Sequence, residues 1–136
     1  MTTRMLKRAL RWAMLGGLAA GWLVAAPALS RAAELVMFES PTCDWCAAWE
    51  REVGVVYDKT EEGQRAPLRR VSLAEERPAD LDGVSGVVYT PTFVLMENGA
   101  ERGRILGYPG EANFWGLLGE LISRLGGAPA EGQTKG

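Results

Sequence analysis

The sequence predicts an α/β fold built on a mixed four-stranded sheet. Three observations lead to this prediction. Residues 34–73 show the pattern of a strand, a helix and a second strand, a βαβ unit in which both strands run parallel with a right-handed crossover. An Asn-Gly pair at 98–99 joins two β-rich runs, which predicts an antiparallel hairpin. An amphipathic segment over 111–125 predicts a closing helix that packs on the sheet.

The first half of the chain supplies the βαβ unit. Its first strand, 34–38, is short and dense in apolar residues, so we expect it to be central and buried on both sides. A helix is predicted over 43–58, followed by a polar surface connection. The second strand is predicted at 68–73, where apolar residues alternate at Val71 and Leu73. The expected apolar face of the helix consists of Cys46, Trp49, Val53, Val56 and Tyr57.

The second half supplies the hairpin and the last helix. Ahead of the hairpin, Pro78 could begin a short helix that Gly83 then breaks. The hairpin strands are predicted at 90–96 and 101–107, and Gly126 is expected to stop the closing helix. The face of that helix expected to meet the sheet consists of Phe114, Leu117, Leu118, Leu121 and Leu125.

Residues 1–32 have the composition of a secretory signal peptide. They carry five basic and no acidic residues, and the apolar stretch Trp12–Ala26 is short for a membrane span but suits the core of a signal peptide. Small residues would allow cleavage ahead of Ala33 or ahead of Leu29. The alternative is an uncleaved membrane anchor. In both cases the globular part is expected to be exported.

The remaining chain predicts one acidic domain. We assign residues 33–126 to this domain, since about a hundred residues suffice for one core, and expect 127–136 to be a disordered tail. From residue 33 onward, 10 Lys and Arg stand against 17 Asp and Glu, a formal charge of −7. Nucleic acid is therefore not expected as a partner, because it requires a basic face. Arg69 and Arg70 are expected to form a solvated patch.

The candidate catalytic residues are Cys43 and Cys46, placed where the first strand passes into the helix. The N-H groups and the dipole of a helix N-terminus favour a thiolate, and the thiolate is the nucleophile. We therefore expect Cys43 to attack and Cys46, one helical turn later, to resolve the mixed disulfide. As a purely structural crosslink this short loop would contribute only about 2 kcal/mol. A closed zinc site needs four ligands, and the chain has no His and no other Cys.

The order of these elements, with Thr90-Pro91-Thr92 ahead of the hairpin, resembles the thioredoxin family from Glu34 to Leu125. The resemblance implies a thioredoxin-like three-layer sandwich with helices on both faces of the sheet, and a thiol-disulfide oxidoreductase. It also implies that Pro91 is cis and lies against the cysteines, and that the backbone of Thr90 pairs with the substrate; the alternative is an ordinary proline at the start of a strand. Trp45 is expected to be an exposed contact for a partner, and the alternative is that it folds back on its own helix.

A closer resemblance, to the periplasmic thioredoxins of bacterial sulfur-oxidation systems, involves five short segments. They are Met37–Pro41, Ala66–Val71, Thr90–Leu95, Gly107–Glu111 and Phe114–Leu118. This resemblance implies a periplasmic monomer that reduces wrong disulfides on the reactive cysteine of the sulfur-carrier protein. Its electrons would come from a membrane thiol transporter. We expect no cofactor and no metal.

Two departures from the thioredoxin pattern concern the chemistry. Thioredoxins place a buried Asp six residues before the first cysteine as a proton acceptor for the second, and here that residue is Met37. Glu39 could substitute if its side chain turns toward the sulfurs; the alternative is a solvated carboxylate at the strand end. Asp44 and Trp45 replace the familiar Gly-Pro, and an acid beside Cys43 opposes the thiolate that the helix start favours.

Two other functions remain open. The segment Pro41–Cys46 superficially resembles the loop of copper chaperones, and two thiolates suit Cu(I), so a metal carrier is one alternative. The other is an oxidant that donates its disulfide with the same two cysteines. A reduction potential of about −270 mV would indicate a reductant, and one of about −120 mV an oxidant.

Overall fold

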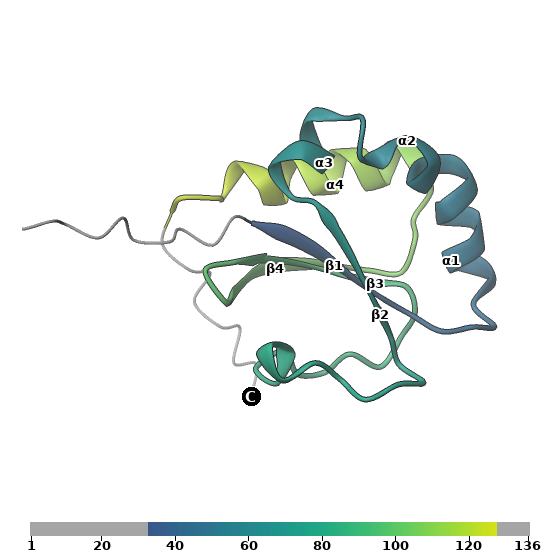
Figure 1. Cartoon of the computed structure of the whole chain (residues 1–136). Coiled ribbons are helices and arrows are strands. Elements are labelled where there is room, and N and C mark those ends of the chain that lie inside the picture. Colours follow the sequence, from purple (N-terminus) through teal and green to yellow (C-terminus); the bar gives the residue numbers. More distant parts are fainter. Residues whose placement is uncertain (1–32, 128–136) are drawn as a thin grey trace, which may run out of the picture.

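The computed structural model describes residues 33–127 and contains one mixed sheet of four strands (Figure 1). The strands are β1 (Glu34–Glu39), β2 (Leu68–Ser72), β3 (Thr92–Glu97) and β4 (Ala100–Leu106), in the spatial order β2-β1-β3-β4. β1 runs parallel to β2 and antiparallel to β3, and β3 runs antiparallel to β4. The predicted fold class, including the βαβ unit and the hairpin, is confirmed.

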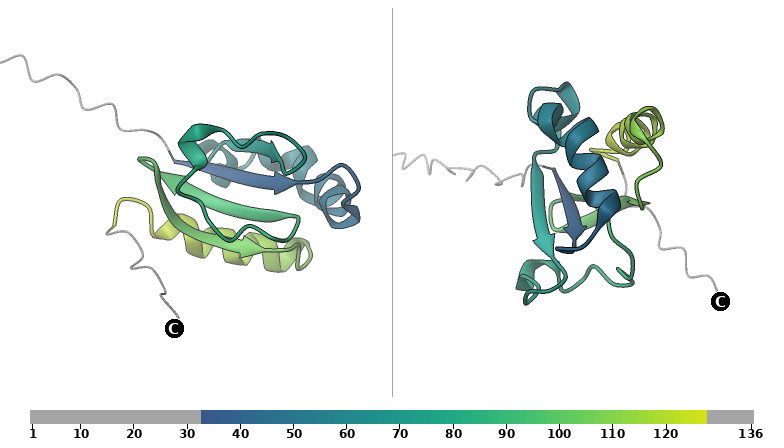
Figure 2. Two further views of the ribbon diagram at one scale, coloured as in Figure 1. Left: turned by 90° about the horizontal axis from the view of Figure 1, so that it is seen from below. Right: turned by 90° about the vertical axis from the view of Figure 1, so that its right-hand side faces the viewer.

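The helices form a layer on one face of the sheet. They are α1 (Asp44–Trp49), the π-helical segment η1 (Glu50–Gly54), α2 (Val55–Tyr57), α3 (Glu61–Arg65) and α4 (Glu111–Ser123). Viewed along the sheet, α1 and α4 lie on the same side (Figure 2, right). The opposite face is covered by the connection between β2 and β3, which contains only the short 3-10 helix η2 (Ala79–Leu81). The helices that the resemblance implied on this second face are therefore reduced to a single 3-10 turn. The short helix predicted after Pro78 is thus present.

Strand β1 separates two hydrophobic clusters, because its side chains alternate between the faces of the sheet. Leu35 and Met37 belong to the cluster under the helices, whereas Val36 and Phe38 belong to the cluster on the other face. All four are fully buried, which confirms the predicted central position. Under the helices, the rings of Trp49, Phe93 and Phe114 pack together with centroids 4.9–5.7 Å apart. This contact joins α1, β3 and α4.

Three residues expected in the core are exposed. Val56 is 40% exposed because the wide turns of η1 rotate it off the buried face while Tyr57 stays inside. Leu73 is 38% exposed because β2 ends one residue earlier. Leu117 is 42% exposed because α4 is rotated about its axis so that Ile122 completes the buried face instead.

The predicted surface connection between the first helix and β2 contains a helix, α3. It begins after Thr60, whose hydroxyl accepts a hydrogen bond from the Gly63 N-H at 3.0 Å. The hairpin turn follows the prediction, since Asn98 and Gly99 have φ values of 54° and 76°, as the tight turn requires. Gly126, the predicted stop, has φ of 80° and lies just after α4.

The predictions for residues 1–32 and for almost all of the tail fall outside the described residues. Among residues 33–127, no helix is long and apolar enough to cross a membrane.

Candidate active site

The two cysteines form a disulfide at the C-terminal end of β1. Their Cα atoms are 5.2 Å apart, and Cys43 is the residue that caps the start of α1. A turn closed by the Cys43 N-H and the Ser40 carbonyl, 3.2 Å apart, leads the chain from the strand into the helix. The Cys46 N-H donates to the Cys43 sulfur at 3.1 Å. A negative charge on this sulfur would therefore be stabilised by the helix N-terminus.

The two sulfur-bearing residues differ in accessibility. Cys43 is half-buried and follows the exposed residues Pro41 and Thr42, whereas Cys46 is only 6% exposed. Cys46 belongs to the same hydrophobic cluster as Trp49, and Cys43 packs against its edge. An incoming disulfide can thus reach Cys43, while Cys46 lies behind it.

The loop before β3 lies beside the cysteine-bearing turn. Thr90 and Ser40, 50 residues apart in the sequence, have their hydroxyl oxygens 3.2 Å apart. The Thr90-Pro91 peptide bond is cis, which confirms the implied isomer, and Pro91 is buried. The fold therefore brings the Thr-Pro pair to the end of the sheet that carries the disulfide.

Exposed hydrophobic side chains flank both of these segments. Trp45 is 63% exposed, so it does not fold back on its own helix. Val88 and Tyr89 are 72% and 67% exposed and immediately precede Thr90. Our sequence interpretation overlooked these two residues; two large apolar residues directly before a Thr-Pro pair were the available signal.

A cavity of about 300 Å³ lies against the disulfide. Its lining consists of Glu39, Ser40, Pro41, Cys43, Cys46, Ala47, Glu50, Arg70 and Ser72. The lining comes from β1, α1, η1 and β2, so the cavity opens between the sheet and the active-site helix. It gives solvent a route to the inner cysteine.

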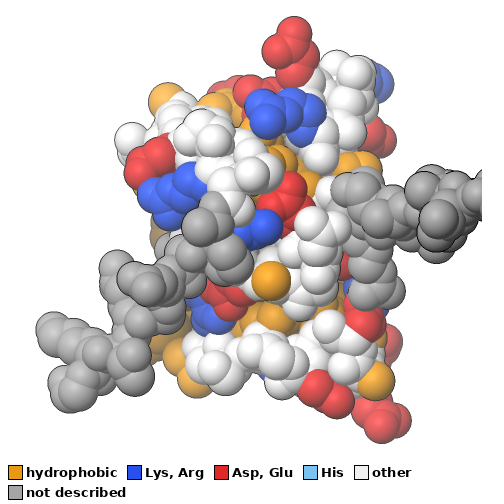
Figure 3. Space-filling model, turned by 90° about the vertical axis from the view of Figure 1, so that its left-hand side faces the viewer, with side chains coloured by type: hydrophobic (Ala, Val, Ile, Leu, Met, Phe, Trp, Pro, Cys, Tyr) orange, Lys and Arg blue, Asp and Glu red, His pale blue; other side chains and the backbone are white. Residues whose placement is uncertain are grey.

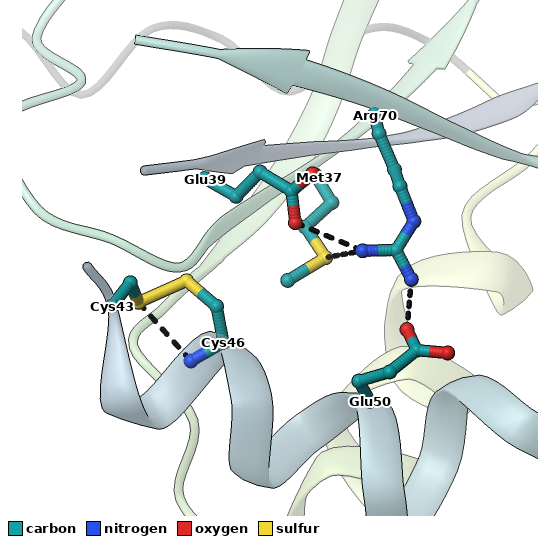
Figure 4. Close-up of polar contacts among 6 residues, drawn as sticks. All are labelled: Met37, Glu39, Cys43, Cys46, Glu50 and Arg70. Atoms are coloured by element: carbon teal, nitrogen blue, oxygen red, sulfur yellow. Dashed lines mark hydrogen bonds and ion pairs between the residues drawn. A yellow bond between two sulfur atoms is a disulfide. The ribbon is translucent and has the colours of Figure 1, made fainter. Parts of the chain in front are cut away.

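Arg70 forms part of the cavity wall, and its side chain remains 39% exposed (Figure 4). Its Nη1 lies 2.8 Å from a carboxylate oxygen of Glu39, and its Nη2 pairs with Glu50. Nη1 is also 3.9 Å from the Met37 sulfur, and the guanidinium lies over the Trp49 ring at 5.6 Å. The parallel register places Arg70 opposite Met37, which explains this meeting.

Arg69 points the other way and belongs to a different site. It pairs with Asp80 and Glu34 at 2.6 and 3.3 Å, near the end of the sheet opposite the disulfide. At that end, acidic and basic side chains are interspersed and the exposed hydrophobic groups are small and separate (Figure 3). The two arginines are not one patch, because neighbouring residues of a strand face opposite sides.

Comparison with known proteins agrees with this geometry. The thioredoxin-like domain family matches residues 24–122. The periplasmic thioredoxin SoxS from Paracoccus pantotrophus, solved in its reduced form, is 42% identical, with a TM-score of 0.63 over 68% of this chain and 97% of SoxS. A thioredoxin from Thermus thermophilus is 26% identical, with a TM-score of 0.57 over 69% of this chain and 76% of that one. No curated protein matches the chain.

The fold, the Cys-x-x-Cys disulfide and these similarities agree on the chemistry. The protein is a thiol-disulfide oxidoreductase, as the sequence indicated. Disulfide-containing proteins are the substrates that such a fold implies. The chain therefore belongs to the thioredoxin-like family.

Proposed function

We propose that this protein is an exported reductant of protein disulfides that works in the periplasm through Cys43 and Cys46. The observation that carries the proposal is the unequal exposure of the pair at the helix start. One sulfur is presented to a partner, and the other is held behind it for release. The similarity to a periplasmic thioredoxin supports the compartment. The reduction potential of thioredoxin, about −270 mV, favours the reducing direction.

The reaction consists of two exchange steps. The Cys43 thiolate attacks one sulfur of the substrate disulfide, and the other substrate sulfur leaves as a thiolate. Cys46 then attacks the Cys43 sulfur of the mixed disulfide and releases the second substrate thiol. Two electrons pass to the substrate, and the protein ends with the Cys43–Cys46 disulfide. A membrane thiol-electron transporter is the proposed source of electrons for the next cycle.

Substrate binding is assigned to the surface around Cys43. Trp45 on one side and Thr90-Pro91 on the other would contact the chain that carries the target disulfide, with Val88 and Tyr89 extending this surface. The exposed rings of Trp45 and Tyr89 and the exposed side chain of Val88 suit an apolar partner segment. The partner proposed first is the sulfur-carrier protein of a sulfur-oxidation system, because the most similar of the solved proteins described above is SoxS.

Trapping tests the division of labour between the cysteines. Cys46→Ser should hold a covalent complex with its substrate, whereas Cys43→Ser should hold none and should be inactive. Affinity capture from an exporting host, followed by mass spectrometry, identifies the trapped species. Complexes formed through Cys46 in Cys43→Ser would mean that the roles are reversed.

The direction of electron flow can be tested on the purified wild-type protein. A redox titration of the Cys43/Cys46 pair should give a potential of about −270 mV, typical of a thioredoxin-like reductant. A value of about −120 mV would make the protein an oxidant.

N-terminal sequencing of the exported protein should find Ala33 first if the leader is cleaved.

A further inference from the structure

The resolving step requires the Cys46 thiol to lose a proton at a buried position, since the thiolate is the attacking species. Met37 belongs to the same hydrophobic cluster as Cys46, is fully buried and cannot accept a proton. Another group that reaches the inner face of the disulfide must take it.

The cavity against the disulfide identifies the candidates. Its charged lining residues are Glu39 from the end of β1, Arg70 from β2 and Glu50 from η1. Its two sulfurs come from the residue that caps α1 and from α1 itself. The guanidinium of Arg70 stays protonated and cannot act as a base. The choice therefore lies between the two carboxylates that Arg70 holds.

Glu50 is directed away from the cysteines. A Cβ atom placed on Gly54 would lie 2.5 Å from a carboxylate oxygen of Glu50, so this carboxylate lies over the next helical turn toward the C-terminus. Cys46 is one turn toward the N-terminus, and Figure 4 shows the Glu50 side chain extending away from it. The Glu50 side chain is also 45% exposed.

Glu39 is the less exposed of the two carboxylates and lines the same cavity as Cys46. Its side chain is 28% exposed and extends from the strand end past Met37 toward Arg70 (Figure 4). The Arg70 Nη1 that binds Glu39 also faces the Met37 sulfur. This shared contact holds the Glu39 carboxylate beside Met37, the residue that replaces the buried Asp of thioredoxins. The cavity has room for water between this carboxylate and Cys46.

We propose that Glu39 accepts the proton of the Cys46 thiol, through water in the cavity, and that Arg70 is a positioning residue. As the proton leaves, the Cys46 sulfur bonds to the Cys43 sulfur, and the bond between Cys43 and the substrate sulfur breaks. The departing substrate thiolate keeps that electron pair and takes up the proton from Glu39 or from solvent. This inference rests on the proposed function.

A stopped-flow experiment on the reduced full-length protein separates the two exchange steps. The probe is an aromatic disulfide whose thiolate is coloured. Attack by Cys43 releases the first coloured thiolate, and attack by Cys46 releases the second. Glu39→Gln should leave the first phase unchanged and slow the second about a hundredfold at pH 7, the lower range for general base catalysis.

The pH profile distinguishes a proton acceptor from a structural residue. At higher pH, hydroxide removes the proton without a protein base, so the deficit of Glu39→Gln should become smaller between pH 7 and pH 10. Glu39→Asp keeps a carboxylate and should recover much of the rate. Glu50→Gln removes the other carboxylate bound to Arg70 and is the matched control, expected to stay within about threefold of the wild type.

Three results would overturn the inference while leaving the proposed function intact. They are an unchanged second phase in Glu39→Gln, a deficit that persists undiminished to pH 10, and an equal deficit in Glu50→Gln. A wild-type protein that releases no second thiolate would instead contradict the proposed function.

Discussion

Replacing Tyr57 with Phe should destabilise the domain without altering its packing. The Tyr57 hydroxyl donates to the Ala66 carbonyl at 2.8 Å, and both residues are fully buried. The ring itself stacks on Trp115 at 6.1 Å with planes 9° apart, a contact that Phe retains. This hydrogen bond joins the C-terminal end of α2 to the chain just before β2.

The magnitude follows from the carbonyl left behind. A buried acceptor deprived of its partner costs about 1–3 kcal/mol, and each kcal/mol lowers the Tm of a domain of this size by about 4–8 °C. Urea unfolding followed by tryptophan fluorescence measures the loss. Tyr89→Phe is the matched control, because Tyr89 is 67% exposed, and it should stay within about 0.5 kcal/mol of the wild type. A loss in Tyr57→Phe no larger than in the control would refute the reasoning.

The same variant has a distinct pH dependence. Burial, followed by the nearby Glu62 charge, raises the pKa of the Tyr57 phenol above its ordinary value of about 10. Above pH 10 the unfolded chain releases this proton while the folded chain keeps it, so wild-type stability falls as the pH rises further. Phe cannot titrate, so the stability gap between the two proteins should narrow above pH 10. A gap that is constant from pH 7 to pH 11 would contradict this assignment.

Two further substitutions test the half of the sheet that carries β3 and β4. Glu97 lies 2.6 Å from Arg102, and their side chains are only 14% and 9% exposed, so Glu97→Gln breaks a buried ion pair and should lower the free energy of unfolding by about 3–5 kcal/mol. Glu120 forms an exposed ion pair with Arg124, so the control Glu120→Gln should lower it by only about 0–1 kcal/mol in the same urea titration. Gly103→Ala would place a Cβ atom 2.5 Å from a methyl group of Leu121 at a φ of 153°, and calorimetry should show a loss of about 1–3 kcal/mol; an unchanged Tm would show that α4 moves aside freely.

Local sequence patterns were sufficient for the order of elements. The apolar run at 35–38 predicted a strand buried on both faces, and Asn98-Gly99 predicted the hairpin, because each depends only on neighbours along the chain. The spacing of Cys43 and Cys46 at a strand-to-helix junction likewise predicted the reactive pair.

The helices were predicted less completely, for a physical reason. Helical periodicity assumes a constant turn, whereas η1 has wider turns and α4 is rotated on the sheet, so Val56 and Leu117 face solvent. The helix α3 has too few residues for a periodic pattern, and only its Thr60 cap marks it.

The placement of Arg70 and Glu50 beside the disulfide depends on the tertiary structure and could not be predicted from local patterns. Arg70 meets Met37 only because β1 and β2 pair in one parallel register, and Glu50 reaches Arg70 from a helix 20 residues away in the sequence. Gly54 makes room for the Glu50 carboxylate. From the sequence, a glycine with this role looks the same as a glycine that bends a helix. Local spacing was enough to predict which two cysteines pair, because both lie within one turn of the same helix start. Which charges surround them depends on strand register and helix placement, which only the folded chain sets.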